Sequence, residues 1–176
     1  TTIFPMCDSY VHDFFRSLSE QTYSKFDLLV LNDGFGDLKY LKDKYKNLNI
    51  IELPSAYSIA KNRESLIKYA FFNAYDVAVF GDSDDYFSKE RIEVSLSSLL
   101  ENDIVVNDLT TFSKNEILDR NVFSNRINNQ SNIQVDYIKD KNIFGLSNTA
   151  INLNILNDSI ISFEKDLIAV DWYFFT

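Results

Sequence analysis

The sequence is poor in cysteine and in basic residues, and it has no long apolar run. Its 176 residues contain a single cysteine, Cys7, which excludes an internal disulfide and suits a reducing compartment. No stretch approaches the roughly 20 apolar residues of a membrane span, and no secretory leader opens the chain. We therefore expect a cytoplasmic protein, whose association with the inner face of a membrane would require segments outside these residues.

Basic residues are outnumbered by acidic ones. There are 17 Lys and Arg against 26 Asp and Glu, which gives a formal net charge of −9. Because nucleic-acid binding depends on clustered Lys and Arg, we expect no nucleic-acid partner. An acidic protein can still bind an anionic nucleotide where a divalent cation lies between carboxylates and phosphates. The positions of the acids therefore matter more than their sum.

Apolar residues are plentiful, at 45% hydrophobic and 15% aromatic, so the chain is expected to form one globular domain. Apolar runs alternate with segments of helical period, which predicts an α/β sheet with crossover helices. Strands are predicted at residues 2–5, 26–31, 49–53, 77–80 and 104–106, and helices at 11–21, 38–45, 59–74 and 89–100. Residues 133–137, 149–153 and 160–163 are strand or helix candidates, and the polar stretch 113–132 is predicted to be mostly loop.

Three acids, Asp82, Asp84 and Asp85, follow a predicted central strand and Gly81. Acids this close repel one another, so they need a compensating cation or hydrogen-bond donors. An Asp-x-Asp segment can hold Mg²⁺ or Mn²⁺ while leaving coordination positions open for diphosphate oxygens. The alternative is that Asp84 or Asp85 only caps the helix that begins near Ser88.

Other acidic and phosphate-handling motifs fit less well. In a calcium EF-hand, Tyr86 and Phe87 would occupy the positions that need a ligand and a glycine. A phosphatase or nucleotidyltransferase predicts an Asp-x-Asp-x-Thr nucleophile or a glycine-rich phosphate loop, and the sequence has neither.

Several segments, in order along the chain, resemble the family 2 glycosyltransferases with the GT-A fold. Residues 17–23 resemble the family's "Ser-Leu-Leu-x-Gln-Thr-Tyr" helix end, and residues 29–37 its "Val-x-Asp-Gly-Ser-x-Asp" turn. Residues 59–63 are similar to its "Ala-Arg-Asn-Arg" helix, and residues 79–87 to its "Phe-Leu-Asp-Ser-Asp-Asp" signature. The resemblance implies an α/β, Rossmann-like GT-A domain over residues 1–176, with a mostly parallel mixed sheet flanked by helices. It also implies that the family's domain would continue beyond residue 176.

The resemblance assigns expected roles to residues at the donor side. Pro5 and the loop after it would border the nucleobase, and Asp33 would accept a hydrogen bond from the base edge. Asp82 would approach the ribose or sugar, while Asp84, together with Asp85, would hold the metal. The first loop departs from the family's "Pro-x-Tyr-Asn", so Tyr10 is a candidate for base stacking, and Cys7 is read as a packed thiol near this loop.

Two residues of the helix before the acids could also serve the donor. Arg63 could pair with the diphosphate, since a guanidinium binds phosphate oxygens bidentately. Its alternative is a surface salt bridge with Glu64 or Asp76. Asn62 could line the same site or only satisfy a local backbone group.

The second half of the chain resembles the family more weakly. Residues 145–150 are reminiscent of its acceptor-side loop, and Val170-Asp171-Trp172 resembles its "Glu-Asp-Trp" segment. Asp171 would then be the general base of an inverting transfer, because an attacking hydroxyl must lose its proton, and Trp172 would pack against a sugar face. The alternative is that Asp171 simply heads a C-terminal aromatic helix.

The expected activity is a metal-assisted transfer, with inversion, of a sugar from a nucleotide-diphosphate donor, a UDP-sugar. The acceptor would be a saccharide or a lipid-linked hydroxyl, as in polysaccharide biosynthesis. A non-catalytic GT-A-like module that binds nucleotide or carbohydrate is the alternative, and Asp171 turned away from the cleft would favour it.

Overall fold

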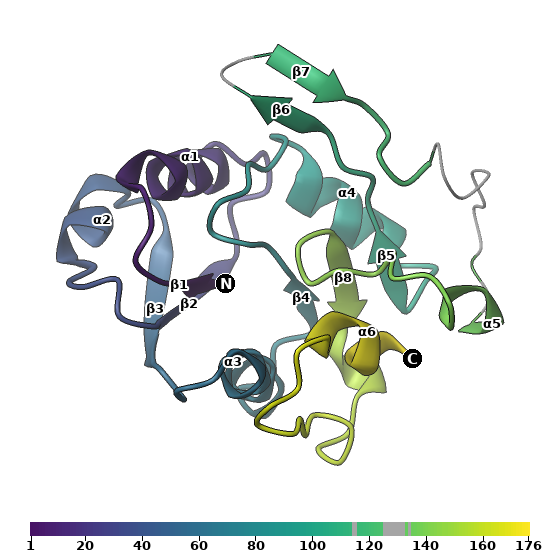
Figure 1. Cartoon of the computed structure of the whole chain (residues 1–176). Helices are drawn as coiled ribbons and strands as arrows, with labels where there is room; N and C mark the ends of the chain where they lie inside the picture. The colour runs from purple at the N-terminus through teal and green to yellow at the C-terminus, as the bar shows by residue number, and fades with distance from the viewer. Residues whose placement is uncertain (114–115, 125–132, 134) are drawn as a thin grey trace.

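The computed structural model describes residues 1–113, 116–124, 133 and 135–176. Two three-stranded sheets lie next to each other in this part of the chain (Figure 1). The first is parallel, in the order β1 (Thr2–Ile3), β2 (Asp27–Asn32) and β3 (Asn49–Pro54). The second is antiparallel, in the order β4 (Val77–Val79), β8 (Thr149–Asn152) and β5 (Ile104–Val106).

Helices connect and cover these strands. The longer ones are α1 (Asp8–Ser19), α2 (Lys39–Lys44), α3 (Ile59–Phe72) and α4 (Arg91–Ser98). Shorter ones follow at α5 (Val135–Ile138), at the 3₁₀ turn η1 (Leu153–Ile155) and at α6 (Val170–Phe175). Every helix predicted from periodicity is confirmed, with boundaries that differ by a few residues, as is usual at helix ends.

The sequence of β2 explains why helices cover both sides of the parallel sheet. Side chains alternate along a strand, so Leu28 and Val30 face one layer and Leu29 faces the other. Leu28 and Val30 pack with buried residues of α1 and α2, whereas Leu29 packs against a cluster that includes Ala70 of α3. Burial on both faces is what the continuous apolar run predicted.

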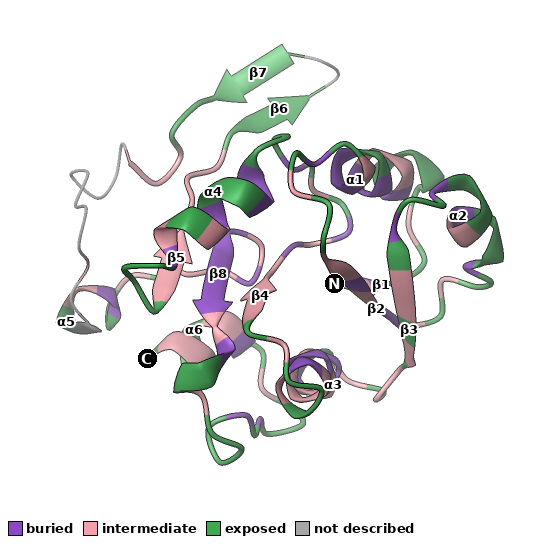
Figure 2. Cartoon of the chain, turned by 180° about the vertical axis from the view of Figure 1, so that it is seen from behind, coloured by how far each residue is buried: buried purple, intermediate pink, exposed green. Residues whose placement is uncertain are grey.

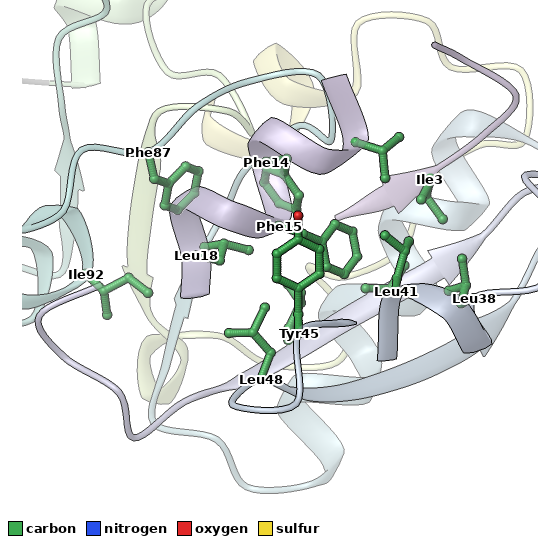
Figure 3. Close-up of a cluster of buried hydrophobic side chains, with 13 residues drawn as sticks. Ile3, Phe14, Phe15, Leu18, Leu38, Leu41, Tyr45, Leu48, Phe87 and Ile92 are labelled. Carbon is green, nitrogen blue, oxygen red and sulfur yellow. The ribbon is translucent and has the colours of Figure 1, made fainter. Parts of the chain in front are cut away.

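The larger core cluster lies under α1. Phe14 and Phe15 are each at most 1% exposed, and their rings meet edge to face with centroids 5.8 Å apart. Figure 3 shows these rings between Phe87, which follows the acidic residues in the sequence, and Tyr45, which follows α2. The acidic segment is therefore anchored by an aromatic residue in the core.

Three predicted segments differ in detail from the structure. The polar stretch 113–132, predicted to be mostly loop, includes part of a β-hairpin that begins before it: β6 (Thr111–Ser113) pairs with β7 (Glu116–Asp119), and both strands are exposed (Figure 2). Residues 114–115 and 125–132 lie outside the described part. Residues 160–163 form neither a strand nor a helix. The predicted central strand, β4, is the outer strand of its hydrogen-bonded sheet and lies between β8 and the parallel sheet.

Within the described ranges, none of the helices combines the length and apolar character needed to cross a membrane.

Candidate functional site

The carboxyl ends of β1, β2 and β4 meet at one edge. The backbone N–H of Asp33, just after β2, donates to the carbonyl oxygen of Ile3 at 2.7 Å. The hydroxyl of Ser83 donates to the carbonyl oxygen of Thr2 at 2.8 Å. These bonds bring the loop after β1, the loop after β2 and the acidic segment together, at the position where open α/β sheets bind ligands.

The acidic turn, defined as residues 82–85, is closed by a bond of 3.1 Å from the Asp85 N–H to the Asp82 carbonyl oxygen. Its side chains point in different directions. Ser83 is 1% exposed and holds the turn against β1, Asp84 is exposed, and Asp85 is half-buried. The turn therefore presents Asp84 to solvent.

The helix-cap alternative for these acids is wrong. Helix α4 begins at Arg91 with Glu90 at its N-cap position, and no side chain caps it. Asp84 and Asp85 precede the helix by several residues, so the acidic turn has no role in starting it.

Arg63 forms an ion pair with Asp82, in which its Nη2 donates to the Asp82 Oδ1. The side chains are 18% and 37% exposed, respectively. The neighbouring Glu64 instead binds Lys61 and Lys68 and accepts a bond from the backbone of Phe163. Arg63 thus pairs with the acidic turn and does not form the surface salt bridge with Glu64 or Asp76 that was the alternative.

Burial and repulsion within the acidic turn together raise the pKa of one of its acids. Burial, followed by the negative charges of Asp82 and Asp84, raises the pKa of Asp85 from 3.8 to about 6, against the opposing effect of Arg91. A cation placed near the turn would relieve this repulsion. This is the electrostatic condition under which a divalent ion is favoured.

The acids do not form a metal site by themselves. In the described part of the chain, no group of three or more His, Cys, Asp or Glu side chains is arranged to hold a metal ion. Asp82 is occupied by Arg63 and Asp85 is half-buried, which leaves Asp84 as the free carboxylate of the turn. The donor set fits a Mg²⁺ or Mn²⁺ ion only if most of its ligands are water and diphosphate oxygens, which is the usual habit of Mg²⁺.

Asp33 and Asn62 lie in one hydrogen-bonded network through Ser55. The Ser55 hydroxyl donates to Asp33 Oδ1, and Asn62 Oδ1 accepts from the N–H of Ala56 at 2.7 Å. Asn62 is 1% exposed, and its Nδ2 has no hydrogen-bond partner. Asn62 therefore supports the loop after β3, while the half-buried Asp33 stays at the edge of the sheet.

Two cavities lie near this edge. An open cleft of about 600 Å³ follows the ends of β2 and β3 and is bordered by Gly34, Ser55 and the 89% exposed Tyr57, whose φ is 61°. Pro5 is exposed, and it lies beside Gly34. A second cavity of about 590 Å³ lies between β2, β4, α1 and α3; its lining includes Arg63 but none of the three acids of the turn. Only the first cavity opens where a nucleobase is expected.

One expectation about the first loop differs in the structure, and another stays untested. Cys7 is exposed, so its expected packing is wrong. It precedes α1 and lies 3.2 Å from the hydroxyl of Ser9, which lowers the pKa of the thiol. Tyr10 lies on α1 and is 55% exposed.

Asp171 lies in the first turn of α6 and contacts the loop expected at the acceptor side. Its Oδ2 accepts a bond of 3.0 Å from the backbone N–H of Leu146. Asn148, 1% exposed, closes this loop by accepting from the Gly145 N–H at 2.8 Å. The indole of Trp172 is 37% exposed and donates to the Ile138 carbonyl oxygen at 3.2 Å, which ties α6 to α5.

Two residues of the 17–23 segment bond to the chain just after the acidic turn. The sequence did not single them out for this role. Ser17 on α1 accepts from the Phe87 N–H at 3.1 Å. Gln21 donates to the carbonyl oxygen of Ser88 at 2.7 Å and accepts from the Ile92 N–H at 3.1 Å. Both belong to the segment 17–23 that carries the family resemblance, so the motif's physical role is to fix the chain between the acidic turn and α4.

The family comparison identifies what the chain is similar to. Residues 3–156 match the model described as glycosyl transferase family 2. No curated relative matches the chain.

Solved structures of S. aureus TarS share the fold. TarS 1–349 superposes with a TM-score of 0.73 at 20% identity, over 99% of this chain and 52% of that one. The complex of TarS 1–349 with UDP-GlcNAc gives 0.73 at 19%, over 99% and 50%. A longer TarS structure gives 0.74 at 20%, over 98% and 31%. The chain thus spans about half the length of TarS 1–349, and the expected GT-A fold is confirmed.

Proposed function

Because the chain belongs to glycosyl transferase family 2, we propose that it binds a nucleotide-diphospho-sugar and transfers the sugar to an acceptor hydroxyl with inversion. The observation that carries the proposal is the acidic turn, which lies at the carboxyl edge of the sheets, paired with Arg63 and next to Asp33. A GT-A fold alone would not define an activity. The proposal instead rests on this group of side chains, in which Asp33 would bind the nucleobase, Arg63 the diphosphate and Asp84 a metal ion.

We propose that the donor is a UDP-sugar that lies along this edge, from the loop after β1 to the acidic turn. The nucleobase would lie in the cleft near Pro5, and Asp33 would accept a hydrogen bond from the N–H group of the nucleobase. The fold neighbours include TarS 1–349 in complex with UDP-GlcNAc and with UDP, which supports uracil as the nucleobase. Arg63 would exchange part of its bond with Asp82 for a diphosphate oxygen, which frees Asp82 for the ribose or sugar.

A divalent ion, Mg²⁺ or Mn²⁺, would be held by Asp84, with Asp85 beside it, and would neutralise charge on the departing diphosphate. The transfer itself breaks the bond between the anomeric carbon and the diphosphate oxygen and forms one to the acceptor oxygen. Asp171 is proposed as the base that takes the acceptor's proton, and the Leu146 N–H holds one of its oxygens in place. The acceptor is proposed to be a saccharide or lipid-linked hydroxyl.

The proposal is tested by removing the exposed carboxylate of the turn. Asp84→Ala should abolish Mn²⁺-dependent binding of UDP, measured by titration calorimetry, and leave the fold intact because Asp84 is exposed. Asp103→Ala, which removes an exposed carboxylate just before β5, is the matched control and should bind like wild type. UDP binding that is the same in Asp84→Ala as in wild type would refute the metal role.

The donor can be identified by thermal shift. Nucleotide sugars that bind the native state raise its melting temperature, and the rise should require Mn²⁺. A binding module without catalytic activity would show the same shifts but release no UDP from UDP-GlcNAc in the presence of saccharide acceptors. That outcome would favour the non-catalytic binding module over the enzyme.

A further inference from the structure

Arg91, the first residue of α4, connects two backbone segments that the proposed reaction needs to hold together. Its Nη2 donates to the carbonyl oxygen of Phe80 and to that of Ser147, each at 2.7 Å. These residues are far apart in the sequence. A single guanidinium nitrogen therefore bridges them.

The surroundings of Arg91 make this a fixed bridge and not a surface contact. The residue is 9% exposed, and its guanidinium carbon lies 3.7 Å from the centroid of the Phe87 ring. Burial lowers the pKa of the guanidinium to about 10, while Asp85 and Asp82 act in the opposite direction. A buried cation is costly unless it is well paired, so a role beyond solubility must account for its presence here.

The two carbonyl groups mark the place where the β4–β8 ladder ends. The last ladder bond beyond β4 runs from the Phe80 N–H to the Thr149 carbonyl oxygen at 2.9 Å. From there one segment continues through Gly81 to the acidic turn, and the other leads back to the 145–148 loop. Arg91 bonds to both segments just where backbone pairing stops.

Each segment carries one half of the proposed chemistry. Gly81 and Asp82 follow Phe80 directly, so the Phe80 carbonyl fixes the start of the acidic turn. Ser147 belongs to the loop whose Leu146 N–H donates to Asp171. The bridge therefore sets the distance between the donor's diphosphate site and the side chain proposed as the base.

We propose that Arg91 is a positioning residue that holds the acidic turn and the Asp171-bearing loop in register for transfer. The role rests on the proposed function, but the bridge itself can be tested without any substrate. Lysine retains the charge but lacks the planar fork, so it should restore the bridge only in part.

The substrate-free test is amide hydrogen exchange in Arg91→Met, Arg91→Lys and wild type. Loss of the bridge should speed exchange of the Leu146 amide about tenfold or more in Arg91→Met and less in Arg91→Lys, while the amides of Val30 and Leu31 in β2 keep their wild-type rates. Lys39→Met, which removes an exposed cation paired with Asp43, should change neither set. Unchanged Leu146 exchange, or equal acceleration in β2, would overturn the proposal. If Arg91→Met does not fold, the same comparison applies to Arg91→Lys.

The functional test separates this proposal from the function it rests on. In Arg91→Lys, UDP affinity with Mn²⁺ should remain within about twofold of wild type, while turnover of UDP-GlcNAc falls tenfold or more at unchanged donor KM. A parallel loss of UDP affinity and turnover would contradict a positioning role. Wild-type protein that does not bind UDP would refute the proposed function, whereas the exchange result at Leu146 would stand.

Discussion

Replacing Asp85 with asparagine should stabilise the protein at neutral pH. The folded state raises the pKa of Asp85 from 3.8 to about 6. Ionising this carboxyl therefore costs more free energy in the folded state than in the unfolded chain. At 1.36 kcal/mol per pKa unit the cost is at most about 3 kcal/mol, and the half-exposed side chain reduces it to about 1–2 kcal/mol. Asparagine has a similar shape but no charge, so it removes that cost.

The pH dependence gives this prediction its sign. Below about pH 3 the carboxyl is protonated in both states, so the two proteins should be equally stable there and nearly so at about pH 4. The cost develops between about pH 4 and pH 6 and is complete above that range, so Asp85→Asn should gain its full advantage by pH 7.

Urea unfolding at pH 4, 5 and 8 in EDTA measures the difference in the free energy of unfolding between the two proteins. In thermal unfolding at pH 8, the melting temperature of Asp85→Asn should be about 2–8 °C above that of wild type. Asp103→Asn, which removes an exposed carboxylate, should show no such pH-dependent gain. An Asp85→Asn variant that is less stable than wild type at pH 8 would show that the carboxylate is stabilised by Arg91 more than it is opposed by burial and its acidic neighbours. The electrostatic argument for a cation at the turn would then fail.

Two further substitutions probe the same region. Gly81→Ala should destabilise the protein by about 1–3 kcal/mol in urea unfolding, because its Cβ would lie 2.6 Å from two atoms of the buried Phe87 ring. Adding Phe87→Leu should recover part of that loss, and an unaffected Gly81→Ala would show that the ring moves freely. Asp171→Asn should keep the bond from Leu146 and wild-type UDP affinity but lower turnover by about 10²–10⁴-fold in a UDP-release assay. Turnover close to wild type would exclude Asp171 as the base.

The position of the site could be predicted because it follows from strand order. Asp33 comes directly after an apolar run and Asp82 comes shortly after another, and strand ends that share an edge bring such residues together. The ion pair between Arg63 and Asp82 is consistent with this, since Arg63 lies near the start of α3, the helix that leads into β4. The pattern of the chain was enough to place the acids and Arg63 in one region, but the pairing of Arg63 with Asp82 was not predicted.

Arg91 could not be recognised in the same way. In the sequence it stands in a helical segment with charged neighbours on both sides, where an arginine usually points to solvent. Its bridge depends on Ser147, which is distant in the sequence, and on the antiparallel insertion of β8 beside β4. No local periodicity encodes that insertion.

The β6–β7 hairpin was missed, and the choice between the two roles left open for Asn62 could not be made from the sequence, for related physical reasons. Both strands of the hairpin are short and exposed, so they lack the run of apolar residues that marks a buried strand. The bond from Asn62 to the Ala56 N–H depends on the path of the loop after β3, in which Tyr57 has positive φ. A tyrosine in that conformation is uncommon and is not predictable from residue type.

The distribution of charge around the acidic turn indicates why Asp84, of its three acids, should meet a metal. Each of the other two carboxylates is compensated by a guanidinium group close to the turn. Arg63 forms an ion pair with Asp82, and the charge of Arg91 favours the ionised form of Asp85. Three carboxylates and two guanidinium groups leave one excess negative charge, and Asp84 carries it in an exposed position. A diphosphate arriving at this edge would add further negative charge beside an already unbalanced turn. Binding of the donor should therefore be coupled to binding of a divalent cation, even though the acids alone do not form a closed metal site.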